Sequence, residues 1–284
     1  MYRWHIDSVL AAVFATLASL VGTMLLLVLA FLVWESWPVL HNGGWQHFFK
    51  DDGWYPLEKM FGMMPMVWAS LAVAVGAIVL AAPLGIASAM FQHFYAPQWL
   101  ARLHQLMIAL LAGIPSVVYG LWGLTVLVPL VGQWQPSGAN LFTAILILSL
   151  MILPTVALTS ASALKSVPRV WLHGAAALGM TRKGIVLGVA FPAARQEIIS
   201  GVLLAIARAL GETMAVLMVA GNVVQNPTGL FEPVRVLTAN IALEMAYATG
   251  THRAGLFASG LFLTLLVLLL AYLAAFFSRR PHHV

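Results

Sequence analysis

The sequence contains no cysteine and few charged residues. None of its 284 residues is cysteine, and only 8% are Asp, Glu, Lys or Arg. The absence of cysteine excludes a disulfide framework, a thiolate nucleophile and a cysteine-ligated metal site. The shortage of charge excludes an ordinary soluble globular domain, in which roughly 25% of residues are charged.

Catalytic motifs are missing as well. The sequence has no Gly-x-x-x-x-Gly-Lys-Ser/Thr phosphate loop, so we expect no ATP site in this chain. Its nine histidines all lie outside the long apolar runs, and none forms a His-Glu-x-x-His spacing. We therefore predict that the chain by itself is not an enzyme and binds no metal.

Long apolar runs fill most of the chain, which is 62% hydrophobic. A transmembrane helix needs about 20 mostly apolar residues. Six runs of that length are present, at Val9–Trp34, Met64–Phe91, Leu106–Val131, Leu141–Leu164, Ile198–Val224 and Gly255–Phe277. The sequence predicts an all-α integral membrane protein with about six transmembrane helices, forming one domain over residues 1–284.

The positive charges predict how these helices are oriented. Although the net charge is +5, the cations lie in short loops beside the runs, where they indicate topology rather than nucleic-acid binding. Alternate loops divide them nine to four, Arg208 excluded, and the nine are Arg3, Arg102, Lys165, Arg169, Arg182, Lys183, Arg195, Arg279 and Arg280. Because the cytoplasmic side carries the excess of Lys and Arg, both termini and the 165–197 loop are expected to be cytoplasmic.

The run from Ile198 to Val224 has two different faces if it forms one helix. Small or polar residues recur on one face at spacings of three and four, namely Gly201, Ala205, Arg208, Glu212, Ala215 and Val219. Bulky apolar residues occupy the opposite face. In a bilayer the bulky face can meet lipid, while the small and charged face turns toward other helices or a water-filled cavity.

Arg208 lies near the middle of this run, where an arginine costs roughly 2.5–3.5 kcal/mol to insert. Glu212 is four residues further on and could form an ion pair that only fixes helix packing. The functional interpretation is that the planar donor fork of Arg208 meets a tetrahedral oxyanion in transit. We favour the functional interpretation because ionisable groups inside membranes usually serve transport.

Three segments together resemble one family of membrane proteins. The segment Arg208–Val216 reads Arg-Ala-Leu-Gly-Glu-Thr-Met-Ala-Val, and it resembles the fifth-helix signature of the phosphate-specific ABC transporter permeases of the PstC type. Residues Ile114–Leu124 and Trp54–Leu71 resemble two further segments of the same family. The resemblance implies the type I ABC importer permease fold, with Arg208, Glu212 and Thr213 along the substrate pathway.

The cytoplasmic loop resembles the segment by which importer permeases dock on their ATPase. That pattern is Glu-Ala-Ala, three residues, Gly, nine residues, then Ile-x-Leu-Pro, and the matching positions here are His173, Gly174, Ala175, Gly179 and Pro192. His173 and Gly174 replace the leading Glu-Ala. Arg182 offers a cation to the partner. The resemblance implies that residues 165–197 couple the chain to an ATPase.

The family resemblance also implies the partners of the chain. They are a second, homologous permease, a dimer of ATPase subunits that binds ATP and Mg, and a periplasmic phosphate-binding protein. Inorganic phosphate would be the substrate, membrane lipid the surroundings, and the bacterial inner membrane the location. No cofactor is expected in this chain.

Two alternative functions remain open from the sequence. A permease for sulfate or molybdate would share the Arg-Ala-x-Gly-Glu core within Arg208–Glu212. A secondary transporter would be expected to show an internal repeat, and the first three runs do not convincingly resemble the last three.

Overall fold

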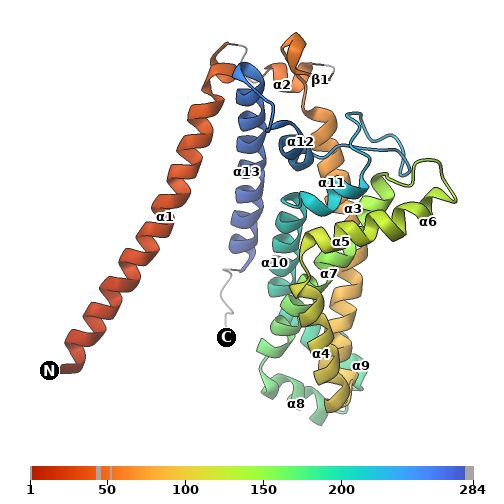
Figure 1. The fold of residues 1–284 in the computed structure, drawn as a ribbon. Coiled ribbons are helices and arrows are strands. Elements are labelled where there is room, and N and C mark those ends of the chain that lie inside the picture. The colour runs from red at the N-terminus through yellow and green to blue at the C-terminus, as the bar shows by residue number, and fades with distance from the viewer. Residues whose placement is uncertain (1, 43–45, 52, 279–284) are drawn as a thin grey trace.

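The computed structural model describes residues 2–42, 46–51 and 53–278, and this part is almost entirely helical (Figure 1). The long helices are α1 (Tyr2–Asn42), α3 (Met64–Met90), α4 (Gln98–Gly113), α7 (Leu141–Ser166), α10 (Phe191–Leu210) and α13 (Gly250–Ser278). The short helices are α2 (Gln46–Lys50), α5 (Ser116–Trp122), α6 (Val128–Gly132), α8 (Arg169–Ala177), α9 (Arg182–Ile185), α11 (Met214–Val219) and α12 (Leu237–Glu244). Arg279 and Arg280 lie outside the described residues.

Shorter elements join these helices. A 3-10 turn, η1 (Pro56–Glu58), connects the antiparallel strands β1 (Trp54–Tyr55) and β2 (Met60–Phe61), which pair Trp54 with Phe61. Three π-helical segments, in which the helix widens by one residue per turn, continue or interrupt long helices. They are η2 (Phe91–Tyr95), η3 (Gly123–Leu127) and η4 (Val186–Ala190).

The centre of the bundle is formed by α3, α7 and α10, which pack through small residues. Ala77 and Ala81 of α3 are fully buried. A Cβ atom added at Gly85 would lie 2.9 Å from the Cβ of Val156 on α7, and one added at Gly201 of α10 would lie 2.5 Å from the hydroxyl of Thr159. Small residues let helix backbones approach closely, which is how helices associate in a bilayer without a hydrophobic driving force.

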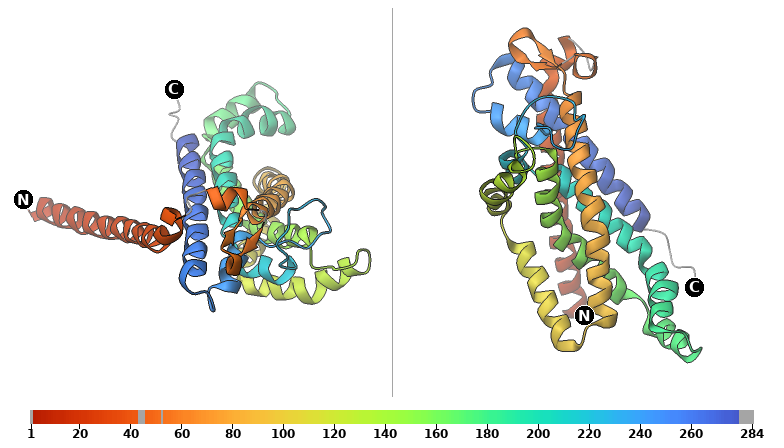
Figure 2. Two further views of the ribbon diagram at one scale, coloured as in Figure 1. Left: turned by 90° about the horizontal axis from the view of Figure 1, so that it is seen from above. Right: turned by 90° about the vertical axis from the view of Figure 1, so that its right-hand side faces the viewer.

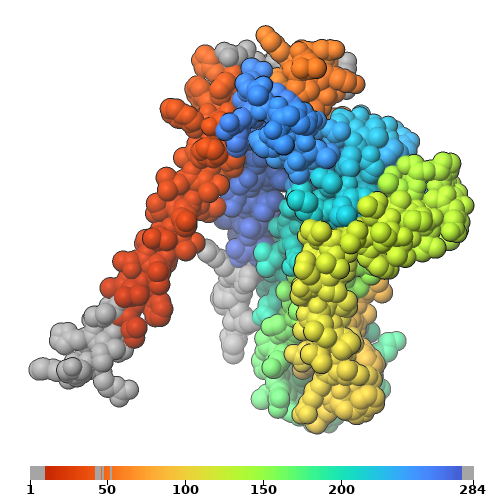
Figure 3. All heavy atoms as spheres, viewed as in Figure 1, coloured from red at the N-terminus to blue at the C-terminus, as the bar shows by residue number. Residues whose placement is uncertain are grey.

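Helix α1 stands apart from this bundle. It meets α13 near one end, where Phe31 and Phe257 pack edge to face with ring centroids 5.5 Å apart. Further toward the N-terminus it leans away from the other helices (Figures 1 and 3). The leucines and valines from Leu10 to Val28 are therefore exposed in the isolated chain, as expected of a helix that meets lipid or another subunit.

The number of spans agrees with the sequence prediction, but one span is bent. Five described helical stretches are long and apolar enough to cross a membrane, and α4 with α5–α6 gives a sixth if the pair counts as one span. The pair bends by 90° between Gly113 and Ser116. The predicted continuous run Leu106–Val131 is therefore wrong. Pro115 lacks the N–H that an uninterrupted helix needs, and it forces Ile114 into an extended conformation with ψ 127°.

The predicted span Ile198–Val224 is also wrong in its limits. The continuous helical stretch runs from Arg182 to Leu210, and the chain breaks at Gly211–Thr213 before α11. Arg208 consequently lies in the last turn of a helix rather than near its middle. Glycine costs about 1 kcal/mol in a helix interior relative to alanine, which favours a break at Gly211.

The bundle has two different ends. We call the end that carries β1, β2 and α12 the hairpin end, and the end that carries α8 and α9 the coupling end (Figures 1 and 2). The start of α1 and the finish of α13 both point toward the coupling end. This arrangement agrees with the charge distribution, which predicts that both termini and α8 are cytoplasmic.

Candidate functional site

Arg208 sits on the last turn of α10 and is exposed in the isolated chain. Its neighbours Ala205 and Ala209 are buried against the bundle, whereas the Arg208 side chain itself is exposed. A cation in the last turn of a helix is stabilised by the partial negative charge of the carbonyl groups there. Arg208 also lies close enough to Tyr119 of α5 to interact with it electrostatically.

Glu212 does not pair with Arg208, contrary to the structural alternative in the sequence analysis. Within the described residues, no ion pair joins the two side chains. A carboxylate oxygen of Glu212 instead accepts a hydrogen bond of 3.2 Å from the backbone N–H of Ala215, at the start of α11. Its backbone carbonyl accepts one of 2.8 Å from the hydroxyl of Thr238. Glu212 thus fixes the break between α10 and α11.

Thr213 occupies the N-cap position of α11 and is half-buried, without a side-chain capping bond. Arg208 thus lies in the last turn of α10, whereas Glu212 and Thr213 lie in the three-residue break between α10 and α11. The predicted common face that runs on from Arg208 to Val219 does not exist, because no continuous helix spans these residues.

The bend after α4 packs directly on this break. A Cβ atom at Gly120 of α5 would lie 2.8 Å from the sulfur of Met218 and 2.9 Å from the Cα of Ala215, so α5 and α11 are in close contact. The hydroxyl of Tyr119 donates to the carbonyl of Leu111 at 2.9 Å and holds the bend in place. Interrupted helices at membrane depth are tolerated where they line a cavity or are buried in protein. Two of the segments used to recognise the family therefore meet in space.

The residues of the predicted coupling loop lie at the opposite end. His173 and Gly174 are exposed on α8, Ala175 is buried beneath them, and Gly179 forms the turn that follows. Gly179 has φ +79°, a conformation that other residues adopt only with strain. Arg182 opens α9, and Pro192 directly follows the π-helical segment η4 inside the continuous helical stretch Arg182–Leu210.

The turn between α8 and α9 presents apolar side chains rather than polar ones. Leu178 is 85% exposed and Val170 is 77% exposed. Met180 and Leu187 are exposed nearby. Exposed apolar patches of this kind are typical of protein-binding or membrane-binding surfaces.

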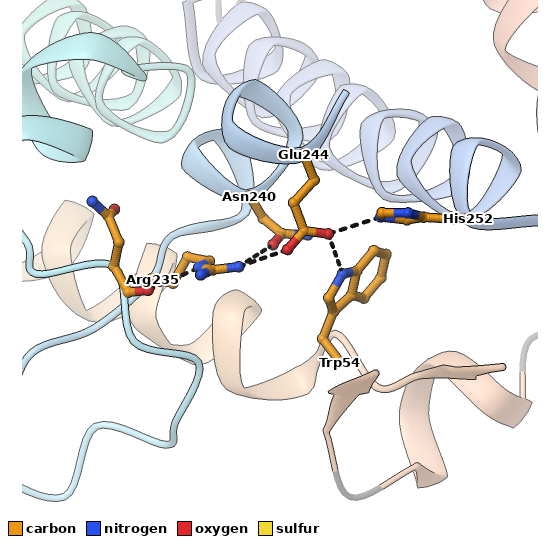
Figure 4. Close-up of polar contacts among 6 residues, drawn as sticks. Trp54, Arg235, Asn240, Glu244 and His252 are labelled. Carbon is orange, nitrogen blue, oxygen red and sulfur yellow. Dashed lines mark hydrogen bonds and ion pairs between the residues drawn. The ribbon is translucent and has the colours of Figure 1, made fainter. Parts of the chain in front are cut away.

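A buried polar cluster occupies the hairpin end (Figure 4). Glu244 of α12 is 7% exposed and accepts three hydrogen bonds. One oxygen accepts from Arg235 at 2.8 Å, and the other accepts from the indole N–H of Trp54 at 2.7 Å and faces the Nε2 of His252 at 2.9 Å. The cluster ties β1 to α12 and to the start of α13.

Arg235 is held from two more sides. Its Nε donates to the carbonyl of Asn222 at 2.9 Å, and its Nη1 donates to the amide oxygen of Asn240 at 3.0 Å. On the neighbouring loop, hydrogen bonds from the hydroxyl and the backbone N–H of Thr228 lower the pKa of Glu232.

The sequence analysis missed the cluster around Glu244, because its members are scattered over the chain from Trp54 to His252. The acidic residue in an otherwise apolar segment, Glu244, is the one local signal that could have found it.

Comparisons with known proteins point to one family. Residues 81–283 match the family described as binding-protein-dependent transport system inner membrane component. The probable ABC transporter permease protein YqgH of Bacillus subtilis is 40% identical over 238 residues, which cover 80% of this chain and 77% of that protein. The phosphate transport system permease protein PstC of Haemophilus influenzae is 34% identical over 292 residues, with 94% and 92% covered.

Solved structures show the same fold at lower identity. A chain from a bacterial ABC transporter involved in the import of the acidic polysaccharide alginate superposes with a TM-score of 0.66. It is 16% identical, and the match covers 99% of this chain and all of that one. At this identity the similarity concerns the fold alone.

Proposed function

Because the chain belongs to the family of binding-protein-dependent transport system inner membrane components, we propose that it forms half of the membrane pathway of a phosphate importer. Family membership makes the chain a multi-pass permease subunit of an ABC importer in the inner membrane. It is not an enzyme, and ATP is bound by a partner ATPase. The family also implies a binding protein and a second permease as partners.

Phosphate is favoured as the substrate by two observations. Relatives that cover most of the chain, among them PstC of Haemophilus influenzae, are phosphate transport system permeases. Arg208 also offers a planar fork of donors that matches a tetrahedral oxyanion. Sulfate and molybdate share this tetrahedral shape, so they are the alternatives that the transport experiment must distinguish.

The placement of Arg208 carries the proposal. Its guanidinium is exposed, it has no acidic partner among the described residues, and it stands where the broken helices α10–α11 and α4–α5 meet. An arginine without a counter-ion at membrane depth is costly unless it meets an anion or water. We propose that Arg208 contacts the transported anion, while Glu212 and Thr213 set the geometry of the break beside it.

The coupling function is assigned to residues 165–197. The exposed apolar side chains Val170 and Leu178 would bury against the ATPase, and Arg182 would add a cation at the rim. Gly179 shapes the turn that presents them. The hairpin end would receive the periplasmic phosphate-binding protein, and the exposed faces of α1 and α13 would meet membrane lipid or the second permease. We propose no role for nucleic acid.

Replacement of Arg208 by alanine in the assembled importer tests the substrate pathway. We expect labelled phosphate uptake into proteoliposomes to be abolished while the complex still assembles, because the anion loses its donor fork. Arg208→Lys keeps the charge without the fork and should retain only a small part of the activity. Wild-type uptake by Arg208→Ala would reject the proposed role. Uptake of labelled sulfate or molybdate by the wild-type importer without uptake of labelled phosphate would reject phosphate as the substrate.

A further inference from the structure

The coupling end contains a basic cavity that the transport function does not use. It has a volume of about 540 Å³ and lies between the turn from α3 to α4 and the junction of α7 with α8. Its polar lining includes Lys165, Arg169, His93 and the side chains of Gln92, Gln98 and Gln105. Ligand pockets in proteins have volumes of roughly 300–1,000 Å³, so the cavity is large enough for a small ligand.

The positive charges in this cavity are not neutralised by the protein. Lys165 and Arg169 both act electrostatically on His93, so the three groups share one space. None of the described residues that line the cavity is acidic. In the part of the chain that the structure describes, neither Lys165 nor Arg169 has an ion-pair partner. The nearest acid along the neighbouring helix, Glu197, accepts a hydrogen bond from Ser166 instead.

The beginning of α8 adds to this positive potential. Arg169 is the first residue of this nine-residue helix, and Pro168 in the N-cap position has no side chain that could accept from the free N–H groups. The N-terminus of a helix carries a partial positive charge and attracts anions. The two cations, Lys165 and Arg169, and the N–H groups at the start of α8 repel one another electrostatically. A bound anion offsets this repulsion.

From this arrangement we infer that the cavity is a binding site for a phosphate group on the cytoplasmic side of the membrane, separate from the pathway at Arg208. The glutamine amides supply neutral donors around the two cations, which suits the several oxygen atoms of a phosphate. Basic pockets between helices on the cytoplasmic side bind phospholipid headgroups. Free phosphate in the cytoplasm presents the same chemistry.

The position of the cavity connects it to the coupling segment. Arg182 of α9 lies over the ring of Tyr95, with the guanidinium 5.9 Å from the ring centroid, so the turn from α3 to α4 touches α9. Arg169 belongs to both the cavity and α8. A phosphate group held by Lys165 and Arg169 would therefore stabilise α8 and α9 in their observed arrangement.

The experiment uses the whole importer in nanodiscs, with the Lys165→Gln/Arg169→Gln double variant. Arg102→Gln is the matched control, because Arg102 is an exposed cation of α4 that does not line the cavity. Gln98→Glu is a second variant: it adds a negative charge to the cavity at the first residue of α4, where an acid favours the helix. Both cavity variants should weaken binding about tenfold or more, and the control should not.

Two probes distinguish the sources of the phosphate group. Nanodiscs of phosphatidylcholine with or without phosphatidylglycerol report headgroup binding, measured as phosphatidylglycerol retained per complex by native mass spectrometry. Equilibrium binding of labelled inorganic phosphate in pure phosphatidylcholine nanodiscs reports free phosphate. Loss of either signal in the cavity variants supports the site and names its source. Equal retention of both ligands by the wild type, Gln98→Glu and the double variant would overturn it.

An Arg208→Ala background separates this inference from the transport pathway. Binding of a phosphate group at the cavity should persist in this background. Arg208 is in the last turn of α10, whereas the start of α10 follows the coupling segment beside the cavity. If binding disappears with Arg208→Ala and survives the cavity variants, the bound phosphate belongs to the pathway and the cavity site is rejected.

Discussion

The two ends of the molecule treat their charges in opposite ways. At the hairpin end, Glu244 is buried and bonded to Trp54, Arg235 and His252, so its charge is paired within the chain. At the coupling end, Lys165 and Arg169 line a cavity without an acidic partner among the described residues, and Leu178 is exposed. Buried charge is therefore paired at the hairpin end, whereas basic and apolar side chains are left open at the coupling end.

This difference suits the two tasks of a permease subunit. A rigid hairpin end keeps the helices in register where they leave the membrane, because breaking a buried ion pair costs several kcal/mol. An apolar coupling end with an unpaired basic cavity gains stability only when a partner or ligand covers it. The contrast predicts that mutations at the coupling end will weaken binding to partners, whereas mutations at the hairpin end will destabilise the fold locally.

Deletion of Gly174–Gly184 should have the largest effect. The deletion removes the turn with Leu178 and Gly179, and we expect the ATPase subunits to be lost from the purified complex and uptake to stop. Quantitative copurification measures this loss. An undiminished amount of ATPase with the truncated chain would contradict the assignment of residues 165–197.

A pair of point variants sharpens the same comparison. Leu178→Glu places a charge in the exposed apolar patch and should reduce the amount of copurified ATPase. Leu230→Glu is the matched control, because Leu230 is an exposed leucine on the loop between α11 and α12, whose carbonyl bonds to Phe142 at the start of α7, whereas the coupling segment follows the end of α7. If both variants retain or both lose the ATPase equally, the apolar turn is not the docking surface.

Glu244→Ala should have an intermediate effect, confined to the hairpin end. Removing the carboxylate leaves Arg235 and the indole N–H of Trp54 buried without their acceptor, which costs about 3–5 kcal/mol. Hydrogen exchange should show increased opening of the segment 222–252, while ATPase copurification stays normal. Glu244→Gln retains an acceptor oxygen and should cost less. Unchanged exchange in Glu244→Ala would show that the cluster does not hold this end together.

Gly179→Ala should have the smallest effect, at the coupling end. Nothing lies within 4 Å of an added Cβ there, so the cost is that of a positive φ alone, about 1–2 kcal/mol. Gly174→Ala, in the interior of α8 with equally open surroundings, should instead stabilise the helix by about 1 kcal/mol. Hydrogen exchange of residues 169–185 measures both changes, and the same sign in both variants would exclude backbone strain as the cause.

The sequence predicted the membrane spans well because a bilayer imposes length and apolarity on each span locally. The prediction of continuous helices was wrong at Pro115 and Gly211, because at both positions a helix-breaking residue lies within an uninterrupted apolar run. Prolines alone did not decide the matter, because Pro83 and Pro154 lie inside unbroken helices. At the two breaks α5 packs closely on α11, and such packing between distant segments is not visible in a single run.

The hairpin-end cluster could not be predicted for a different reason. Trp54 and Glu244 are 190 residues apart in the chain, and their contact depends on how the whole bundle folds. Arg208 was selected as a candidate because an arginine within an apolar run is a strong local signal. The alternative ion pair with Glu212 does not form, because the helix that would place the two residues on one face ends before Gly211.

Because α1 is tilted, we expect the shape of this subunit to depend on the thickness of the bilayer. Its apolar stretch Leu10–His41 has 32 residues, or about 48 Å of helix, whereas the hydrocarbon core is about 30 Å thick. The excess length is accommodated by tilt, and α1 tilts away from α13 because the contact of Phe31 with Phe257 lies near one end. A thicker membrane should bring α1 more upright and reduce the angle between it and the bundle.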